Sequence, residues 1–161
     1  LGHKRLAIIT GSLQTQSGKQ RLEGFRRYLE KEGLSLAGDY IFEGDYSRRS
    51  ARDGMEKFLS LEHQQPPTAI FAASDDMALE AISVILEKGL KVPDDISVIG
   101  FDDNPASLYG PVALTTVRQP LFRMAEESVK CLNSLIQNRK DGLIKNILEP
   151  ELVIRDSCMP L

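Results

Sequence analysis

"TAIFAASDDMALEAI", residues 68–82, contains an apolar run, three polar residues and then a segment with helical periodicity. Residues 68–73 form a strand candidate. Ser74 is of the type that caps a helix N-terminus, and Asp75 and Asp76 suit the positive end of the helix dipole. The apolar residues that follow recur every three or four positions, which predicts one buried helix face; they are Met77, Ala78, Ala81, Ile82 and Ile85. The stretch therefore predicts a strand followed directly by a helix.

The same strand-then-helix order recurs along the chain. Further strands are expected at 5–10, 39–45 and 95–101. The segment "SGKQ" predicts a capping box with Ser17 as the N-cap of a helix that ends at Gly33, and Ser47 can cap the next helix. Strand centres recur about every 30 residues, the length of one strand-helix-strand unit. We therefore predict an α/β fold with a doubly wound parallel sheet.

Composition limits the possible functions. The chain has 161 residues, 42% of them hydrophobic, and a net charge of −3. This length predicts one domain with a real core, and the acidic balance argues that this stretch does not itself grip nucleic acid. Cys131 and Cys158 have no metal-ligand spacing and no disulfide framework can be read from them. This favours a location in the reducing cytoplasm. No apolar run is long enough for a membrane helix, and the start without Met, almost inside a strand, favours a fragment.

Polar residues follow each predicted strand, where a sheet of this type binds its ligand. These segments are 10–17, 44–46, 74–76 and 102–104. The last contains two adjacent carboxylates, Asp102 and Asp103, directly after an apolar run. Because burying a bare carboxylate is costly, each of them should be hydrated, hydrogen-bonded or paired. The sequence predicts a ligand-binding rim at this edge of the sheet.

Enzyme alternatives find little support. The loop 11–19 superficially resembles a phosphate-binding P-loop, but six residues separate its glycines where the motif needs four, and Gln20 stands where it needs Ser or Thr. A phosphate could still sit at that helix start. No nucleophile-elbow motif occurs, and adjacent aspartates do not suggest the opposed environments of an acid-base pair. We predict a non-enzyme without cofactor or metal.

Several motifs together resemble the effector-binding module of the LacI/GalR family of bacterial transcription repressors. They are "RLAIITG", "SGKQRLEGFRRYLEKEGL", "PPTAIFAASDDMALEAI", "GLKVPDDISVIGFDDNP", "ALTTVRQP" and "LEPELVIRDS". They run in family order over nearly the whole chain, but they match only the second half of that module. The resemblance implies a periplasmic-binding-protein-like type I fold with one complete lobe and a piece of the second. The implied division is an effector-binding lobe at 1–112, a crossover strand and helix of the other lobe at 113–140, and a return strand at 141–161.

The resemblance also implies an effector site. Arg21 corresponds to the effector-clamping arginine and Asp102 to the carboxylate that accepts hydrogen bonds from the effector. Tyr46 stands at the family's aromatic wall, Ser74 and Asp75 align with a polar pair at the rim, and Ser17 lies in a ligand-contacting loop. Without the resemblance, Arg21 is expected to be an exposed helical arginine, Tyr46 can be a half-buried strand-end residue, and a capped helix start explains Ser74 and Asp75. Asp103 is expected to be structural.

The implied assembly is a cytoplasmic homodimer that binds operator DNA through a headpiece absent from this chain. The dimer residues implied by the resemblance are Ser47, Ser50, Ala81, Ile85 and Tyr109. The effector is expected to be a sugar, with a sugar phosphate or a purine as alternatives, and to act allosterically by favouring one arrangement of the two lobes. The helix of the crossover segment should carry an uncovered apolar face. A periplasmic-type sugar carrier, which has the same lobes and cleft, is the alternative function.

Overall fold

The computed structural model describes residues 1–61, 65–137 and 146–161, which fold as six strands, four α-helices and two short 3-10 helices. In chain order these are β1 (Leu6–Thr10), α1 (Gln16–Lys31), η1 (Gly38–Tyr40), β2 (Ile41–Glu43), α2 (Arg48–Leu59), β3 (Ala69–Ala72), α3 (Asp75–Glu87), β4 (Ser97–Asp102), η2 (Pro105–Leu108), β5 (Thr115–Arg118), α4 (Leu121–Ile136) and β6 (Glu151–Val153). Each predicted strand and helix is present.

Local sequence signals determine where most helices begin and end. Ser74 accepts a hydrogen bond from the Met77 N–H and caps α3, and Ser47 caps α2 in the same way. Gly33 and Gly89 follow α1 and α3 with positive φ, the conformation that favours glycine after a helix.

The predicted cap of α1 is wrong. Thr15 is the N-cap and accepts from the Gly18 N–H at 3.1 Å, whereas Ser17 lies in the first turn. The reason is the preceding turn, in which both the Thr15 N–H and its hydroxyl donate to the Ser12 carbonyl oxygen. This turn places Thr15 before the helix and leaves the Ser17 hydroxyl available for other contacts.

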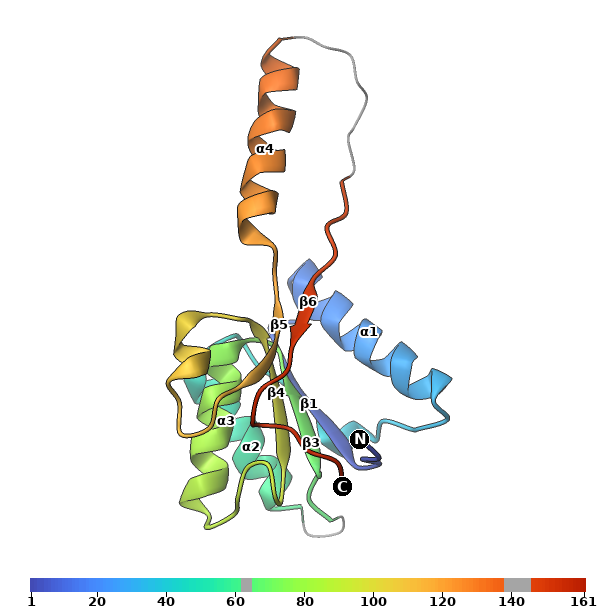
Figure 1. The fold of residues 1–161 in the computed structure, drawn as a ribbon. Helices are drawn as coiled ribbons and strands as arrows, with labels where there is room; N and C mark the ends of the chain where they lie inside the picture. Colours follow the sequence, from blue (N-terminus) through green and yellow to red (C-terminus); the bar gives the residue numbers. More distant parts are fainter. Residues whose placement is uncertain (62–64, 138–145) are drawn as a thin grey trace.

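The strands form one sheet in the order β2-β1-β3-β4-β5-β6 (Figure 1). The pairs up to β4–β5 are parallel, as predicted. The last pair, β5–β6, is antiparallel, because the chain returns to the sheet after α4. The sheet is therefore mixed at one edge.

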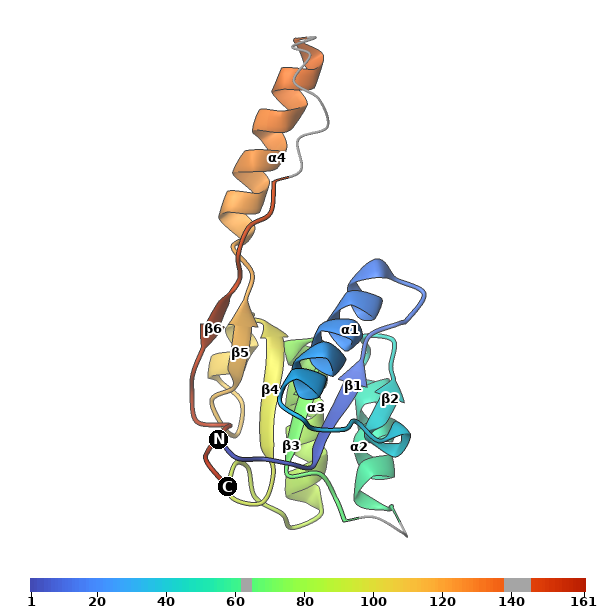
Figure 2. The ribbon, with the colours of Figure 1, turned by 90° about the vertical axis from the view of Figure 1, so that its right-hand side faces the viewer.

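Helices cover both faces of the sheet, as a doubly wound fold requires. Figure 2 shows α1 on one face and α2 and α3 on the other. The main core lies between the sheet and the inner sides of α2 and α3, where Met55, Phe58 and Ile82 are fully buried. On the opposite face the rings of Phe25 and Phe71 stack with their centroids 5.9 Å apart.

One part of the predicted division of the chain is wrong. The strand in 113–120 was expected to belong to the other lobe, but β5 pairs with β4 along its whole length and so belongs to the first lobe's sheet. Hydrogen bonding to a neighbouring strand, which local sequence does not reveal, decides this membership. The boundary at 140 falls within 138–145, outside the described residues. The assignment of α4 to a second lobe remains a prediction.

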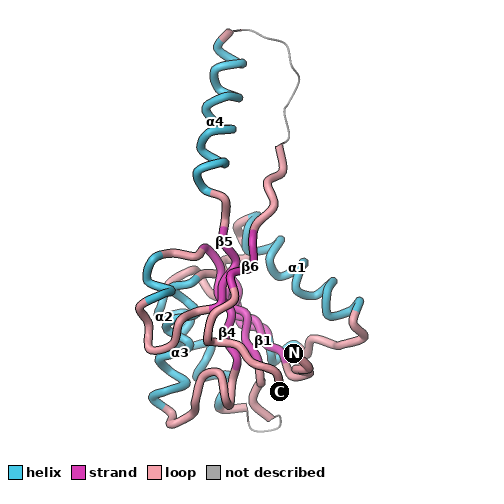
Figure 3. The backbone as a smooth tube through the Cα atoms, viewed as in Figure 1, coloured by secondary structure: helices cyan, strands magenta, loops and turns pink. Residues whose placement is uncertain are grey.

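Helix α4 stands away from the body of the molecule (Figure 3). It has no buried residue, although its sequence is amphipathic. Phe122 is 92% exposed, and Val129, Leu132 and Ile136 are also exposed. The predicted uncovered apolar face is therefore present. Along the described ranges, no helix is both long and apolar enough to cross a bilayer.

Candidate functional site

The carboxyl ends of β1, β3 and β4 lie side by side because the strands are parallel. The loop after β1 leads into α1, which brings Ser17 and Arg21 to this edge, and the segment after β2 brings Tyr46. The hydroxyls of Ser17 and Tyr46 are 3.0 Å apart, and the Arg21 guanidinium lies 5.9 Å from the centre of the Tyr46 ring. Three of the predicted site residues are thus brought together.

Arg21 occupies the centre of this group. Its Nη1 donates to the Ala73 carbonyl oxygen at 2.6 Å, which ties the side chain to the end of β3. Its guanidinium carbon lies 3.8 Å from the centre of the Phe101 ring. Stacking on an aromatic face holds the guanidinium plane in one orientation. Within the described residues, its other N–H groups donate no hydrogen bond to the protein, so they can bind a ligand.

Tyr46 is held in an unusual backbone conformation, with φ at 70°. Its ring lies against Gly11, where an added Cβ atom would come within 1.9 Å of the ring. The glycine at this position is therefore needed for the ring to approach the end of β1. This packing fixes one flat aromatic wall beside Arg21.

Asp102 ends β4 and is partly buried, with φ at 125°. Its Oδ1 accepts a hydrogen bond of 2.6 Å from the Gln119 side chain. Burial raises the pKa of Asp102, although the Gln119 hydrogen bond and the positive charge of Arg21 act in the opposite direction. The carboxylate therefore lies within the electrostatic reach of the arginine.

Ser74 and Asp75 are placed differently from the prediction. Ser74 is buried, and its hydroxyl caps α3. Asp75 is 0% exposed and accepts hydrogen bonds from the Thr116 hydroxyl and the Asn104 N–H. Burial raises the pKa of Asp75, against these hydrogen bonds, which lower it. The structure does not support a direct ligand contact for either residue, because neither side chain reaches the surface of the rim.

Asp103 is structural, as expected. It pairs with Arg118 at 2.6 Å and with Arg155 at 2.5 Å. Burial acts to raise the pKa of Asp103, but the hydrogen bonds and charges of the two arginines together outweigh it and hold the pKa below its usual value. The two adjacent carboxylates therefore lie in opposite environments, contrary to the expectation from their adjacency in the sequence.

Sequence reasoning missed Phe101 and Gln119, which both contact predicted site residues. Phe101 belongs to an apolar strand. Within such a strand, no local sequence pattern distinguishes a ring that faces the rim from a ring in the core. Gln119 follows β5, and only the β4–β5 pairing brings it to Asp102. The position of polar residues just beyond a strand was a usable signal for Gln119 but not for Phe101.

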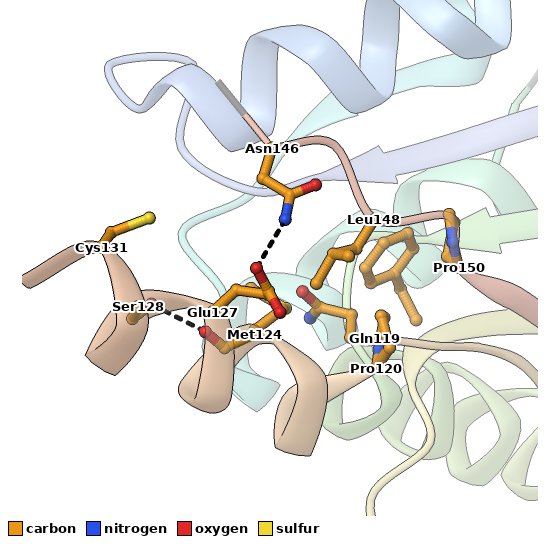
Figure 4. Close-up of a pocket in the computed structure, with 10 residues that line it drawn as sticks. Gln119, Pro120, Met124, Glu127, Ser128, Cys131, Asn146, Leu148 and Pro150 are labelled. Carbon is orange, nitrogen blue, oxygen red and sulfur yellow. Dashed lines mark hydrogen bonds between the residues drawn. The ribbon is translucent and has the colours of Figure 1, made fainter. Parts of the chain in front are cut away.

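A hollow of about 480 Å³ adjoins the rim between α4 and the segment 146–150 (Figure 4). Gln119 lines it and connects it to Asp102, and Met124 and Leu148 also line it. The Asn146 side chain donates to Glu127 across the hollow at 2.9 Å. Among the described residues, no group of three or more His, Cys, Asp or Glu side chains is arranged to hold a metal ion.

Two of the predicted dimer residues are wrong as direct contacts. Ala81 and Ile85 are 0% exposed and belong to the core between α3 and the sheet, so a partner cannot touch them. The helical periodicity identified them correctly as one face, but this face packs against the sheet. Ser47 and Ser50 are partly exposed at the start of α2, and Tyr109 is 84% exposed. These three remain predictions.

The chain is similar to parts of known transcriptional regulators. The family model described as "periplasmic binding protein-like domain" matches residues 1–158. The chain is 39% identical over 158 residues to the HTH-type transcriptional repressor PurR of Aliivibrio fischeri, covering 98% of this chain and 47% of the repressor. It is also 39% identical over 160 residues to the probable HTH-type transcriptional repressor ExuR of Bacillus subtilis, covering 99% and 47%. The chain spans about half the length of the curated relatives it matches.

Solved structures show the same relationship. The transcriptional regulator CelR in complex with cellobiose superimposes with a TM-score of 0.91 at 31% identity, covering 97% of this chain and 47% of that one. The lac repressor dimer bound to operator and the anti-inducer ONPF superimposes with a TM-score of 0.90 at 34% identity, covering 99% and 54%. The chain therefore belongs to the family of periplasmic binding protein-like domains found in LacI-family transcriptional regulators.

Proposed function

We propose that this chain is the effector-sensing part of a bacterial transcriptional repressor. It binds a small polar metabolite at the rim formed by Arg21, Tyr46, Ser17 and Asp102. The observation that carries the proposal is the position of the Arg21 guanidinium, 3.8 Å from the centre of the Phe101 ring and 5.9 Å from the centre of the Tyr46 ring, with N–H groups that donate to no other described residue besides Ala73. Such a site offers donors, acceptors and a flat apolar wall to one ligand. Asp75 accepts a hydrogen bond from the Asn104 N–H and so holds the loop that follows Asp102.

The chemistry of the rim favours a sugar, with a sugar phosphate or a purine as alternatives. A carboxylate accepts hydrogen bonds from neighbouring hydroxyls, and a guanidinium donates to hydroxyls, carboxylates or phosphates. The Tyr46 and Phe101 rings can pack against sugar C–H groups or a base. One structural neighbour is a cellobiose complex, and another, a LacI-family regulator from Escherichia coli, is a complex with phosphate.

The proposed response is a change in affinity for operator DNA through a headpiece outside this chain. An effector that contacts two lobes shifts their arrangement only by its difference in affinity for the two states. Relatives named as repressors favour this role over that of a periplasmic sugar carrier. A repressor must meet DNA, so the proposal includes a cytoplasmic location. It assigns no reaction, cofactor or metal to the site.

Thermal shift measurements on the intact protein that carries this chain test the proposal. The panel is cellobiose, glucose 6-phosphate and hypoxanthine, each added to wild type, to Asp102→Asn and to the control Asp76→Asn. Asn is used because it keeps the shape of the Asp side chain and removes only its charge. Asp76 lies at the same edge and is exposed, so its substitution controls for loss of one surface charge.

A bound ligand at a hundredfold excess over Kd adds about 2.7 kcal/mol of stability. We expect one ligand class to stabilise wild type and Asp76→Asn but not Asp102→Asn. Equal stabilisation of all three proteins would show that Asp102 is not in the site. No stabilisation by any of the three probes would contradict the proposed ligand classes.

We also propose that the protein is a homodimer with Ser47, Ser50 and Tyr109 in the contact. Sedimentation velocity of the intact protein checks this. Tyr109→Asp places a charge on an exposed aromatic position and should shift the protein toward the monomer. An unchanged dimer would remove Tyr109 from the interface.

A further inference from the structure

The second acid of the Asp102–Asp103 pair points into the molecule. The side chain of Asp103 is 10% exposed and that of Arg155 is 12% exposed, so their ion pair is almost completely shielded from water. Arg118, the second partner, is about half exposed. Asp103 thus uses both carboxylate oxygens within the protein, and neither is directed to the ligand rim.

The two arginines lie on the two segments that connect α4 to the body of the molecule. Arg118 is the last residue of β5, three residues before the first residue of α4, and Arg155 lies two residues beyond β6. Arg155 also donates to the Leu114 carbonyl oxygen at 2.7 Å and to the Ser107 hydroxyl at 2.9 Å. Asp103 therefore fastens the loop after β4 to both crossing strands at one point.

The backbone at this point is strained. Asp102 and Asp103 both have positive φ, at 125° and 57°, in a region that residues other than glycine rarely adopt. Such a conformation persists only where the surroundings hold it. The holding contacts are the two arginines on Asp103 and the Asn104 N–H, which donates to Asp75 at 2.8 Å. Release of Asp103 would allow the loop to relax and would turn the Asp102 carboxylate.

We propose that Asp103, through its ion pairs with Arg118 and Arg155, is a positioning residue that aims the Asp102 carboxylate at the effector. The inference rests on the proposed function, because it assigns the ligand contact to Asp102. It also explains the two adjacent acids at the end of β4: Asp102, the last residue of the strand, binds ligand, and Asp103 holds the strained turn. The Asp103 side chain contacts both the turn that carries Asp102 and the segments that lead to α4. Ligand contact and the position of these segments are therefore linked through Asp103.

The test compares variants of the intact protein in two measurements. The first is the affinity for whichever of cellobiose, glucose 6-phosphate and hypoxanthine stabilises wild type. The variants are Asp103→Asn, Arg118→Gln and Arg118→Lys, with Asp102→Asn as the ligand-contact control. Ile82→Val, a core change far from the rim, controls for lost stability alone. Arg118→Gln removes the more exposed partner, so it keeps the test usable if Asp103→Asn does not fold.

The second measurement needs no ligand. In protein labelled with ¹⁵N-glutamine, the Gln119 side-chain amide reports its hydrogen bond to Asp102, and Gln119→Leu assigns its signal. If Asp103 aims Asp102, this signal moves toward that of a free side-chain amide in Asp103→Asn and Arg118→Gln. It should stay in place in Ile82→Val.

We expect Asp103→Asn and Arg118→Gln to weaken probe binding by about tenfold at temperatures where they are fully folded, the loss expected from misaligning one charge-assisted hydrogen bond. Arg118→Lys should restore most of the affinity, and Ile82→Val should bind like wild type. If Asp102→Asn loses binding but Asp103→Asn and Arg118→Gln bind like wild type, the inference is overturned and the proposed function stands. If no probe binds, the proposed ligand classes fail, and an unmoved Gln119 signal would then overturn the inference independently.

Discussion

Helices α3 and α4 carry the same kind of sequence but have opposite surroundings. Both have apolar residues at helical spacing, yet the inner residues of α3 are completely buried and α4 has no buried residue. Helix α3 packs on the sheet beside α2, whereas α4 stands outside the body (Figure 1). The comparison teaches that hydrophobic periodicity specifies which face of a helix is apolar, but not whether another element is present to bury that face.

The two helices also begin differently. Ser74 caps α3 through its side chain, whereas Pro120 precedes α4 without a side-chain cap. Between the two helices, Asp103 connects the loop after β4 to the strands on either side of α4. The molecule thus has a well-packed region, a projecting region and a charged junction between them. We expect substitutions in these three regions to change the free energy of unfolding by different amounts.

The largest expected effect lies in the packed region. Ile82→Ala in α3 should cost about 2–5 kcal/mol because it leaves a cavity in the core. Ile136→Ala in α4 should change stability by no more than about 0.5 kcal/mol, because this side chain is exposed. Urea denaturation of the 161-residue chain measures both. A large loss for Ile136→Ala would break the comparison, and a large loss only in the intact protein would show that α4 is covered there.

The junction should respond to pH. The pKa of Asp103 in the folded protein lies below its unfolded value of about 3.9, so its ion pairs stabilise the fold above that value. This contribution is lost as the pH falls through the folded pKa. Asp103→Asn should therefore cost about 1.5–3 kcal/mol at pH 7, the range for hydrogen bonds to charged groups, and progressively less in acid. Urea denaturation of wild type and variant from pH 7 to pH 3 measures the difference. A pH-independent difference would contradict the ionised pair.

Loss of the α3 cap should have a smaller effect. Ser74→Ala removes the acceptor for the Met77 N–H and should cost about 1 kcal/mol. Ser83→Ala, in the middle of the same helix, is the matched control and should be neutral or slightly stabilising, because alanine is the better helix former. Equal costs in thermal denaturation would show that Ser74 contributes by packing and not as a cap.

The smallest effect is expected at the surface. The Arg48–Asp76 pair has side chains 60% and 54% exposed, and its coupling energy should be at most about 1 kcal/mol. A double-mutant cycle with Arg48→Ala and Asp76→Ala measures this coupling, which should shrink further at high salt. A coupling clearly above about 1 kcal/mol would show that solvent exposure does not weaken this pair.

Sequence reasoning found most of the fold because most of its signals are local. The strands, the Ser47 and Ser74 caps and the end of α1 were correct. Two of the three errors depended on contacts with a distant part of the chain, and the third depended on a local turn that the capping pattern does not reveal. The turn around Ser12 moved the α1 cap to Thr15, the β4–β5 pairing kept β5 in the first lobe, and packing on the sheet buried Ala81 and Ile85.

The site divides in the same way. The sequence alone determined that polar residues gather beyond the strand ends, since strand order and parallel direction bring those ends together. Only the tertiary structure decided that Asp102 meets Gln119 and that Asp103 turns inward to two arginines 15 and 52 residues away in the chain. Periodicity and capping are properties of neighbouring residues, whereas the surroundings of a carboxylate depend on which distant strands the fold brings beside it.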